Sequence, residues 1–260
     1  MKNKDVELWN KEAIKSLKLK SPNWFSYYIG NSYIRATEIG LKHVNSDKIS
    51  LLKTDLWNEG VEYQRDILGR YQNRKNFNLY GIDISPVVCS HARSKIKNIY
   101  VIQGDIRNLP FKNNSFDILL DLSTLDHIPE NQIIDVLQEY KRVLKKDGIL
   151  VLIFWYNSFF IKFIKYIRRY IRRARENATQ YYFSLKLVKN NVKKRFDIIE
   201  EYCIGTLLCI PYLRFILNRL PIFLRNRILN VVLNLEYSKT SKFILKNFSG
   251  LYVIIGRRKQ

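Results

Sequence analysis

Short apolar runs separated by polar stretches recur along most of the chain. These runs are rich in Ile, Leu, Val and Tyr, and most of them lack the polar alternation of a strand with one solvated face, so they predict strands buried on both faces. The predicted strands are residues 48–54, 78–83, 99–103, 116–122, 148–155, 196–204 and 251–256.

Helices are predicted in the intervals between these strands and ahead of the first one. Strands that alternate with helices are typical of α/β proteins with a doubly wound, mostly parallel sheet, and this is the fold class that we predict. The alternation is interrupted at residues 157–195 and again at 211–246, which we interpret as insertions. The predicted helices are residues 5–19, 32–41, 61–72 and 130–146 and one that begins at Ser85-Pro86, with an aromatic, turn-rich connection at 21–32.

Positive charge is concentrated in the second half of the chain. The 260 residues include 45 Lys and Arg against 23 Asp and Glu, for a net charge of +22, and residues 157–260 hold 22 of the basic residues but only 5 of the acidic ones. A basic half beside a near-neutral half favours an anionic partner, either a nucleic acid or an acidic membrane surface. The three cysteines show no metal-ligand spacing, so no metal site is expected. The charged N-terminal segment lacks the apolar core of a signal peptide, which predicts an intracellular, cytoplasmic protein.

Acidic side chains follow four of the predicted strands. Asp55, Asp83, Asp105 and Asp121 each stand at or just beyond a strand end. Because ligands of open α/β sheets bind outside the carboxyl ends of the strands, these carboxylates are expected at one site. An acid after the second strand accepts hydrogen bonds from ribose hydroxyls, and one after the third receives the amino group of an adenine, so the ligand is expected to contain adenosine. The alternative is that each aspartate only caps the helix that follows it.

Three longer stretches within residues 48–156 surround these aspartates: YGIDISPVVCSHAR, VIQGDIRNLPFKNNSFDILLDLSTLDHIP and EYKRVLKKDGILVLIFW. They resemble the motifs of class I S-adenosylmethionine-dependent methyltransferases of the small-molecule type. The resemblance implies a Rossmann-like fold, S-adenosylmethionine as the cofactor and methyl transfer as the activity. It also implies that Asp83 holds the ribose and that Asp105 and Ile106 contact the adenine. The cofactor-binding residues expected on this basis are Asp55, Asp83, Ile84, Asp105, Ile106, Leu122 and Ser123.

The same resemblance divides the chain into four parts. The N-terminal helices are expected to cover the cofactor pocket, and the Rossmann-like core to bind the cofactor. A basic amphipathic insertion follows, and then the last strands of the sheet with a helical lid insertion at about 211–246. The four parts are residues 1–47, 48–156, 157–195 and 196–260.

The loop after the first strand departs from the family pattern. Class I methyltransferases usually carry an acid followed by Gly-x-Gly-x-Gly there, because the backbone approaches the cofactor closely. LLKTDLWNEG keeps the acid, Asp55, but has Trp57 and Glu59 among the residues that replace the glycines. Either the loop still binds, with Asp55 or Glu59 meeting the amino group of the methionine moiety, or the fold persists with a closed pocket; we favour binding. A nicotinamide dehydrogenase is disfavoured, since it also requires a Gly-x-Gly-x-x-Gly loop.

His127, shortly after the fourth strand, is the candidate catalytic residue. As a general base it would deprotonate a hydroxyl acceptor. The alternative is a pocket-shaping histidine, because positioning alone accounts for much of the rate when the methyl donor is already activated. Asp126 is a weaker candidate than His127.

Two segments carry apolar and basic residues together. Residues 159–175 (FFIKFIKYIRRYIRRAR) place apolar side chains on one helical face and basic ones on the other, the pattern of a helix in a membrane interface; a surface helix packed on the sheet shares it. Residues 209–235 are similar, and Pro221 is expected to divide them into two short helices. We therefore predict methyl transfer to a small-molecule or lipid-linked acceptor, with the enzyme peripheral to the inner face of an anionic membrane. The alternatives are an RNA methyltransferase and a non-catalytic interaction protein.

Overall fold

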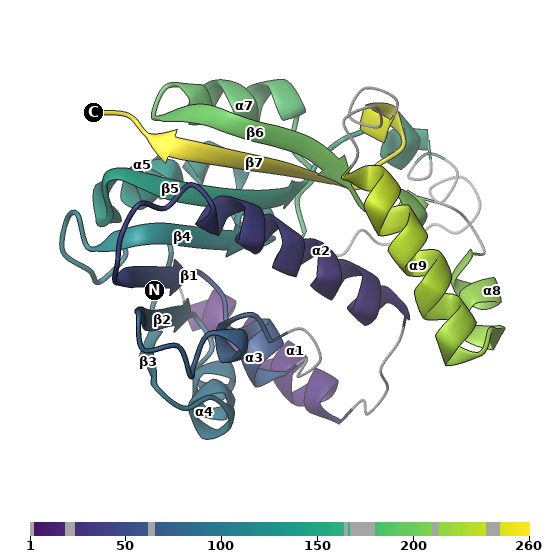
Figure 1. Ribbon diagram of the computed structural model, residues 1–260, viewed down its shortest axis with the longest axis horizontal. Helices are drawn as coiled ribbons and strands as arrows, with labels where there is room; N and C mark the ends of the chain where they lie inside the picture. The colour runs from purple at the N-terminus through teal and green to yellow at the C-terminus, as the bar shows by residue number, and fades with distance from the viewer. Residues whose placement is uncertain are drawn as a thin grey trace.

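The computed structural model describes residues 3–18, 24–61, 66–163, 166, 180–209, 213–237 and 245–260. At its centre is a seven-stranded sheet with the order β3-β2-β1-β4-β5-β7-β6 (Figure 1). β7 is antiparallel to both of its neighbours, and the remaining adjacent pairs are parallel. The predicted fold class, a doubly wound and mostly parallel sheet, is confirmed. The strands are β1 (Ile49–Lys53), β2 (Phe77–Asp83), β3 (Ile99–Gln103), β4 (Phe116–Leu122), β5 (Leu144–Trp155), β6 (Phe196–Ile204) and β7 (Leu251–Arg258).

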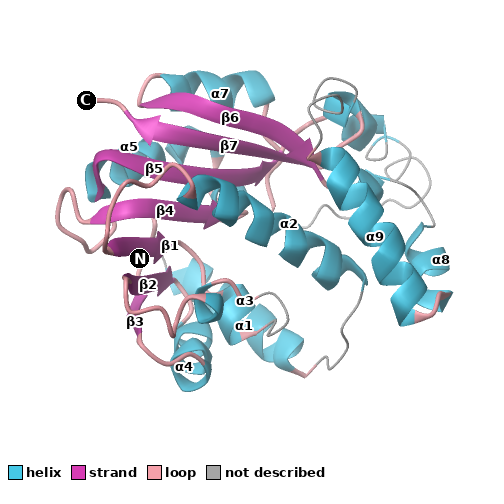
Figure 2. Ribbon diagram, viewed as in Figure 1, coloured by secondary structure: helices cyan, strands magenta, loops and turns pink. Residues whose placement is uncertain are grey.

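Helices cover both faces of this sheet (Figure 2). They are α1 (Asn3–Leu17), α2 (Trp24–Leu41), α3 (Trp57–Gly60), α4 (Pro86–Lys95), α5 (Ile133–Val143), α7 (Leu185–Lys193), α8 (Leu213–Arg219) and α9 (Ile222–Glu236). On one face, strand residues such as Leu51 and Val151 share an apolar core with α2, α4 and α9. On the other, Leu52 and Leu150 share a core with α5 and α7. Because successive strand residues point to opposite faces, a strand covered on both sides is apolar at nearly every position.

The apolar runs located the strands well. All seven predicted strands are present, and the largest discrepancy is that β5 begins at Leu144, four residues before the predicted start. The predicted cap is also present, since the Ser85 hydroxyl accepts the Val88 amide at 3.2 Å and Pro86 is the first residue of α4. Pro221 separates α8 from α9, as predicted.

Two secondary-structure predictions in the N-terminal half were wrong: one helix and one connection. The predicted helix over 61–72 is not formed in the described residues, since α3 ends at Gly60 and a single 3₁₀ turn at Leu68–Arg70 follows. Here the Glu59 carboxylate accepts the amides of Ile67 and Leu68 and shapes a turn. The aromatic connection predicted over 21–32 is helical from Trp24 onward, because its rings pack into the core rather than around a turn.

The insertion predicted at 157–195 is described only in part. Residues 159–163 are helical and α7 closes the segment, but residues 164, 165 and 167–179 lie outside the described part of the chain. Most of the amphipathic helix predicted over 159–175 therefore does too. Within the described residues, no helix has the length and apolar character needed to span a bilayer.

Candidate functional site

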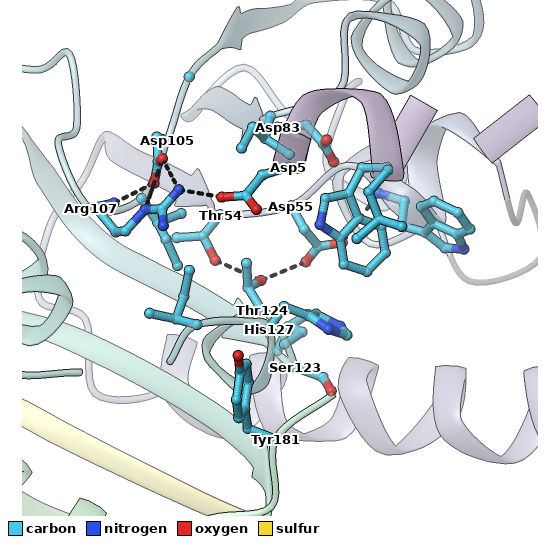
Figure 3. Close-up of a pocket in the computed structure, with 18 of the residues that line it drawn as sticks. Asp5, Thr54, Asp55, Asp83, Asp105, Arg107, Ser123, Thr124, His127 and Tyr181 are labelled. Carbon is cyan, nitrogen blue, oxygen red and sulfur yellow. Dashed lines mark hydrogen bonds and ion pairs between the residues drawn. The ribbon is translucent and has the colours of Figure 1, made fainter. Parts of the chain in front are cut away.

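A cavity of about 400 Å³ lies between the carboxyl ends of the parallel strands and helix α1 (Figure 3). Parallel strands all end at one edge of a sheet, so loops distant in sequence meet there. The cavity is lined by the seven residues expected to bind the cofactor and by His127, although their roles toward a ligand remain predictions. These residues are Asp55, Asp83, Ile84, Asp105, Ile106, Leu122, Ser123 and His127. The other acids considered from the sequence, Glu59, Asp121 and Asp126, do not line it.

Asp83 ends β2 at the wall of this cavity. One carboxylate oxygen accepts the Leu56 amide at 2.9 Å, and the other accepts the Ser85 amide at 2.8 Å. Burial raises the pKa of Asp83 to about 7, while the two amides act in the opposite direction by favouring the ionised form. Because each carboxylate oxygen has two acceptor positions, these bonds leave capacity for the hydroxyl groups of a ligand.

Asp105, which follows β3, is already paired with an arginine. Arg107 Nε donates to both carboxylate oxygens of Asp105 at 2.9 Å, and its Nη2 donates to Asp5 of α1 at 2.8 Å. Figure 3 shows the guanidinium between these two acidic side chains. The hydrogen bonds to Asp105 are the main reason why the pKa of Arg107 is raised. An amino group of a ligand would therefore share Asp105 with Arg107, a partner that the sequence did not reveal.

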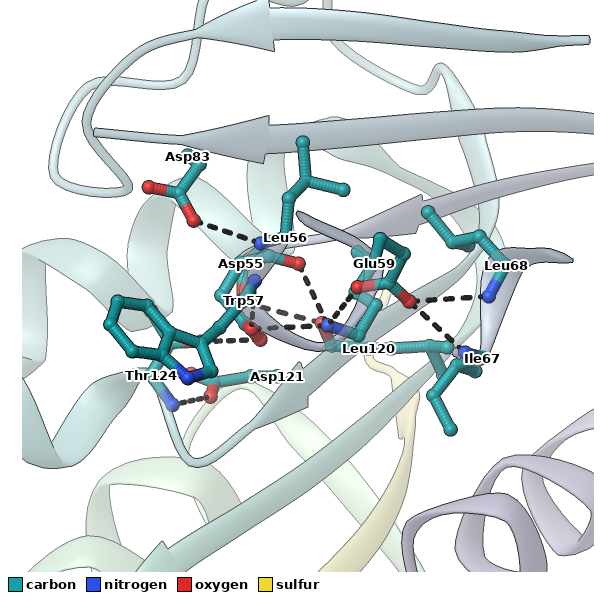
Figure 4. A network of polar contacts seen from close by, with 12 residues as sticks. Asp55, Leu56, Trp57, Glu59, Ile67, Leu68, Asp83, Leu120, Asp121 and Thr124 are labelled. Atoms are coloured by element: carbon teal, nitrogen blue, oxygen red, sulfur yellow. Dashed lines mark hydrogen bonds and ion pairs between the residues drawn. The ribbon is translucent and has the colours of Figure 1, made fainter. Parts of the chain in front are cut away.

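A fully buried lysine organises the loop after β1, whose residues Asp55 and Glu59 are labelled in Figure 4. Lys53 Nζ lies 3.0 Å from Oε2 of Glu59 and 3.1 Å from Oδ1 of Asp55, and it donates to the main-chain oxygen of Asp55 at 2.8 Å. The other oxygen of Glu59 accepts the amides of Ile67 and Leu68 at 3.1 and 3.2 Å. Glu59 is thus an internal acceptor that does not line the cavity, whereas Asp55 reaches it. Of the two carboxylates predicted as partners for a ligand amine, only Asp55 is in position.

The buried charges of this loop compensate one another. Burial alone would lower the pKa of Lys53, but Asp55 and Glu59 outweigh it and the pKa is raised. Burial raises the pKa of Glu59, and the nearby Lys53 opposes that shift. Lys53 therefore keeps its proton inside the fold, because the two carboxylates replace the hydration that it loses.

Close packing in this region depends on two glycines outside the expected glycine motif. A Cβ on Gly81 of β2 would lie 2.3 Å from Leu56 Cδ2, so the Leu56 side chain lies directly against the strand backbone. A Cβ on Gly60 would lie 2.7 Å from the main-chain oxygen of Val88 in α4. The loop therefore approaches β2 and α4 closely through these two positions.

Helix α1 forms one wall of the cavity. The Trp9 ring packs edge-on against His127, with 4.6 Å between ring centroids, and against Trp57, at 5.9 Å. Asn10 accepts a hydrogen bond from the Ser85 hydroxyl at 2.6 Å. Together with the Asp5–Arg107 pair, these contacts attach α1 to the loops after four different strands.

Asp121, the penultimate residue of β4, shapes the loop that carries His127. Its buried carboxylate accepts the amides of Thr124 at 2.7 Å and Leu125 at 3.2 Å and the hydroxyl of Tyr140 at 2.8 Å. Burial raises the pKa of Asp121 to about 7. Asp121 does not line the cavity, so the structure gives this strand-end aspartate a role within the fold.

Ser123 follows β4 with strained backbone geometry. Its φ angle of 77° lies in the left-handed region, which is unfavourable for a residue with a Cβ and is found often at functional sites. Its hydroxyl donates to the buried carboxylate of Asp126 at 2.7 Å. One carboxylate oxygen of Asp126 is thereby hydrogen-bonded, and of Asp126 and His127 only His127 lines the cavity.

Asn58 is a cavity residue that was not predicted. It is 3% exposed, and its side-chain nitrogen is buried without a hydrogen-bond partner among the described residues. A buried donor left unsatisfied costs about 1–3 kcal/mol, so this nitrogen at the cavity wall is available to an acceptor on a ligand or a water molecule. Its place in the glycine-poor loop, between Trp57 and Glu59, was the only sequence signal.

Residues 61–152 match the family model described as Methyltransferase domain. A ubiquinone/menaquinone biosynthesis C-methyltransferase (UbiE) of Campylobacter jejuni is 33% identical over 100 residues, which cover 38% of each chain. A demethylmenaquinone methyltransferase of Staphylococcus haemolyticus is 36% identical over 74 residues, 27% of this chain and 30% of that protein. The chain thus spans less than half the length of these curated relatives.

A solved structure extends the likeness of fold beyond this segment. The crystal structure of geranyl diphosphate C-methyltransferase from Streptomyces coelicolor A3(2), in complex with Mg²⁺, geranyl diphosphate and S-adenosyl-L-homocysteine, has a TM-score of 0.57 at 12% identity. The match covers 86% of this chain and 78% of that one. At this identity the likeness concerns the fold, and the Rossmann-like fold expected from the sequence motifs is confirmed.

Proposed function

We propose that this chain, whose residues 61–152 match the Methyltransferase domain model and whose sheet has a Rossmann-like fold, transfers a methyl group from S-adenosylmethionine to a small, apolar or lipid-linked acceptor. The observation that carries this proposal is the convergence of all eight sequence-selected residues on one cavity at the strand ends. Sites for small molecules commonly have volumes of about 300–1,000 Å³, and this cavity falls within that range.

The groups lining the cavity fit this cofactor. The unpaired side-chain nitrogen of Asn58 suits the carboxylate of the methionine moiety, and the neighbouring carboxylate of Asp55 suits its amino group. Asp83 and Asp105, on the next two strands, offer acceptors for ribose hydroxyls and an adenine amino group. Since the donors and acceptors succeed one another along the strand ends, they match an extended nucleoside ligand.

When bound, S-adenosylmethionine supplies a methyl group on a positively charged sulfur. The contribution of this chain is the environment of that centre: the indoles of Trp9 and Trp57 offer aromatic faces that attract cations, and α1 limits the access of water. For a hydroxyl acceptor, the imidazole of His127 would accept the proton. For an acceptor that needs no base, the same ring against Trp9 would orient it.

The remaining cavity wall supports an apolar acceptor. Leu8, Tyr33, Ile128 and Tyr181 line it together with the two indoles. The Campylobacter and Staphylococcus relatives are named for ubiquinone and menaquinone biosynthesis and for demethylmenaquinone, which favours a lipophilic ring compound as the acceptor class. A peripheral position at a membrane would suit such an acceptor. The exposed aromatic rings of Phe159 and Tyr166 and the basic second half of the chain support that position.

Calorimetry with S-adenosylhomocysteine tests the proposal directly. The wild-type protein should bind, and Asp83→Asn should lower the affinity about tenfold or more, because one acceptor oxygen is replaced by an amide donor. Asp117→Asn is the matched control: Asp117 is also a nearly buried aspartate of the sheet, but it is the second residue of β4, it bonds Ser50 and Lys145, and none of the three lines the cavity. Absence of binding by the wild type, or equal losses in both variants, would contradict the proposal.

A further inference from the structure

The outward face of α9 carries large apolar side chains that a folded protein usually buries. Four of them recur at positions three or four apart and form one stripe along the helix, and two more stand at its first turn. Between 38% and 76% of each side chain is exposed. The α9 stripe consists of Ile222, Phe223, Leu224, Ile228, Val231 and Leu235.

Polar contacts with α2 fix the orientation of α9. Asn230 accepts a hydrogen bond from the Tyr27 hydroxyl at 3.2 Å, and Asn234 accepts one from Arg35. The adjacent Leu229 is fully buried in the core shared with α2. Turning the stripe inward would break these contacts, so its outward position is a property of the folded chain.

The exposed charges near the stripe are positive. Helices α8 and α9 carry four arginines, of which Arg219 and Arg227 are exposed, and one acidic residue, Glu236, which is buried and accepts a hydrogen bond from Tyr28. Pairing of two α9 stripes in a symmetric dimer would place the arginines of both copies at one interface, where they repel. The complementary partner for an apolar stripe with arginines beside it is an apolar layer with an anionic surface.

We propose that the α9 stripe, assisted by Arg219 and Arg227, docks this protein onto an anionic lipid bilayer. A helix of this length extends about 22 Å and would lie in the plane of the interface, with the stripe among the acyl chains and the arginines at the headgroups. The proposal goes beyond methyl transfer and does not depend on it. It also concerns a different surface from residues 159–175, the anchor that the sequence favoured.

The place of α9 in the fold relates this surface to the cavity. Figure 1 shows α8 and α9 at the end of the molecule toward which the parallel strands point. α9 packs along α2, and α2 contributes Tyr33 to the cavity wall. A bilayer docked on the α9 stripe would therefore lie at the same end of the molecule as the cavity, so an acceptor with a lipid tail would have a short path to it.

Flotation of the full chain with vesicles, without cofactor, tests the docking. The protein should float with phosphatidylcholine–phosphatidylglycerol vesicles, less with pure phosphatidylcholine vesicles, and less as salt is added. A variant with serine at Phe223, Ile228 and Val231 should partition at least about tenfold more weakly. Arg219→Gln with Arg227→Gln should weaken partitioning about fivefold or more on anionic vesicles only.

Matched controls come from exposed residues on other elements. Ile134→Ser removes a side chain of α5 that is 45% exposed, and Lys146→Gln with Lys194→Gln removes two exposed charges elsewhere. These variants should float as the wild type does. Asp83→Asn should do so too, which separates failure of docking from failure of cofactor binding.

Several outcomes would overturn the proposal. One is equal flotation of the stripe variant and Ile134→Ser, and another is absence of flotation by the wild type. A wild-type dimer that the serine variant abolishes would assign the stripe to a second copy of the chain. Binding of RNA that the stripe and arginine variants abolish, in the absence of vesicle binding, would assign it to nucleic acid. Circular dichroism melts of each variant establish that the fold is retained.

Discussion

The loop after β1 and the α9 stripe depart from the usual distribution of side chains in opposite directions. Lys53, at the end of β1, and Glu59, in the loop that follows, are charged and fully buried. Phe223 of the stripe is apolar and 76% exposed. In the loop, each buried charge contacts an oppositely charged group of the same chain. The inner face of α9 packs against α2, whereas the stripe on its outer face is exposed to solvent. The buried charges of the loop are therefore compensated by groups of the same chain. Burying the apolar stripe would require a partner outside the chain.

Removing the lysine from the loop should have the largest effect. Lys53→Met leaves Glu59 and Asp55 without their shared cation in a buried environment, so we expect a loss of about 3–5 kcal/mol in the free energy of unfolding, measured by urea denaturation. Lys53→Met with Glu59→Leu should recover part of that loss, because the unpaired buried carboxylate is also removed. Glu12→Gln, at the exposed Lys15–Glu12 pair, is the control and should leave the stability nearly unchanged. Equal effects of Lys53→Met and Glu12→Gln would show that the buried cluster does not stabilise the loop.

Neighbouring positions on α9 should respond very differently to truncation. Leu229 is fully buried, and Leu229→Ala should cost about 2–5 kcal/mol through lost contacts and a cavity. Val231, two residues on, is 55% exposed, and Val231→Ala should change the stability by less than about 0.5 kcal/mol. Chemical denaturation of both variants checks the expectation. A large loss in Val231→Ala would mean that the stripe packs against the chain in solution and is not free for a partner.

A methyl group on Gly81 should test the close contact between β2 and the loop. A Cβ there would lie 2.3 Å from Leu56 Cδ2, and Leu56 is itself fully buried, so Gly81→Ala should cost about 1–3 kcal/mol through overpacking. Combining it with Leu56→Ala should make room for the new methyl group and give a total loss smaller than the sum of the two single losses, as a double-mutant cycle would measure. Strict additivity would contradict the contact.

The buried carboxyl of Asp121 should give an effect that appears as a pH dependence of the free energy of unfolding. An unfolded aspartate titrates near 3.9, whereas burial raises the pKa of Asp121 to about 7 in the fold. Between these values the folded protein holds a proton that the unfolded chain has lost. The associated stability is therefore complete below about pH 3.9 and is lost as the pH rises to about 7.

Asp121→Asn should remove that contribution. The decline of the free energy of unfolding between about pH 5 and pH 6.5 should become shallower by about 1.4 kcal/mol per pH unit. Asp83, whose pKa is also raised to about 7, should maintain a similar decline in the variant. Parallel curves for the wild type and Asp121→Asn in urea denaturation would show that Asp121 titrates normally.

Local patterns in the sequence were sufficient for the sheet and for the cavity wall. Strands covered on both faces leave uninterrupted apolar runs, and parallel strands bring their final residues together whatever the intervening helices do. Asp55, Asp83 and Asp105 could therefore be placed at one edge without knowledge of the helices. The 61–72 prediction failed because an apolar periodicity there competes with the Glu59 carboxylate, whose bonds to two amides favour a turn.

Contacts between distant residues were beyond such patterns. Nothing near Asp105 indicates that Arg107 will pair with Asp5, which is 102 residues away. The sequence showed apolar and basic residues together over 209–235 but not which face of α9 points outward, because an apolar helix looks the same in sequence whether α2 covers one face or both. The lysine at the end of an otherwise apolar β1, followed by Asp55 and Glu59, was a usable signal. It indicates that a buried cation needs anions close by.

The attachment of α1 has a consequence for the order in which the chain acquires structure during synthesis. A helix of 15 residues is marginally stable alone in water, and the side chains that anchor it, Arg107 and His127, are translated about a hundred residues later. At about 5–20 residues per second, the ribosome needs on the order of 5–20 s to produce them. During that interval Trp9 can contact Trp57, which is translated earlier, but it lacks His127, and Asp5 lacks Arg107. Helix α1 precedes the sheet in the chain, yet it should be among the last elements to settle onto it.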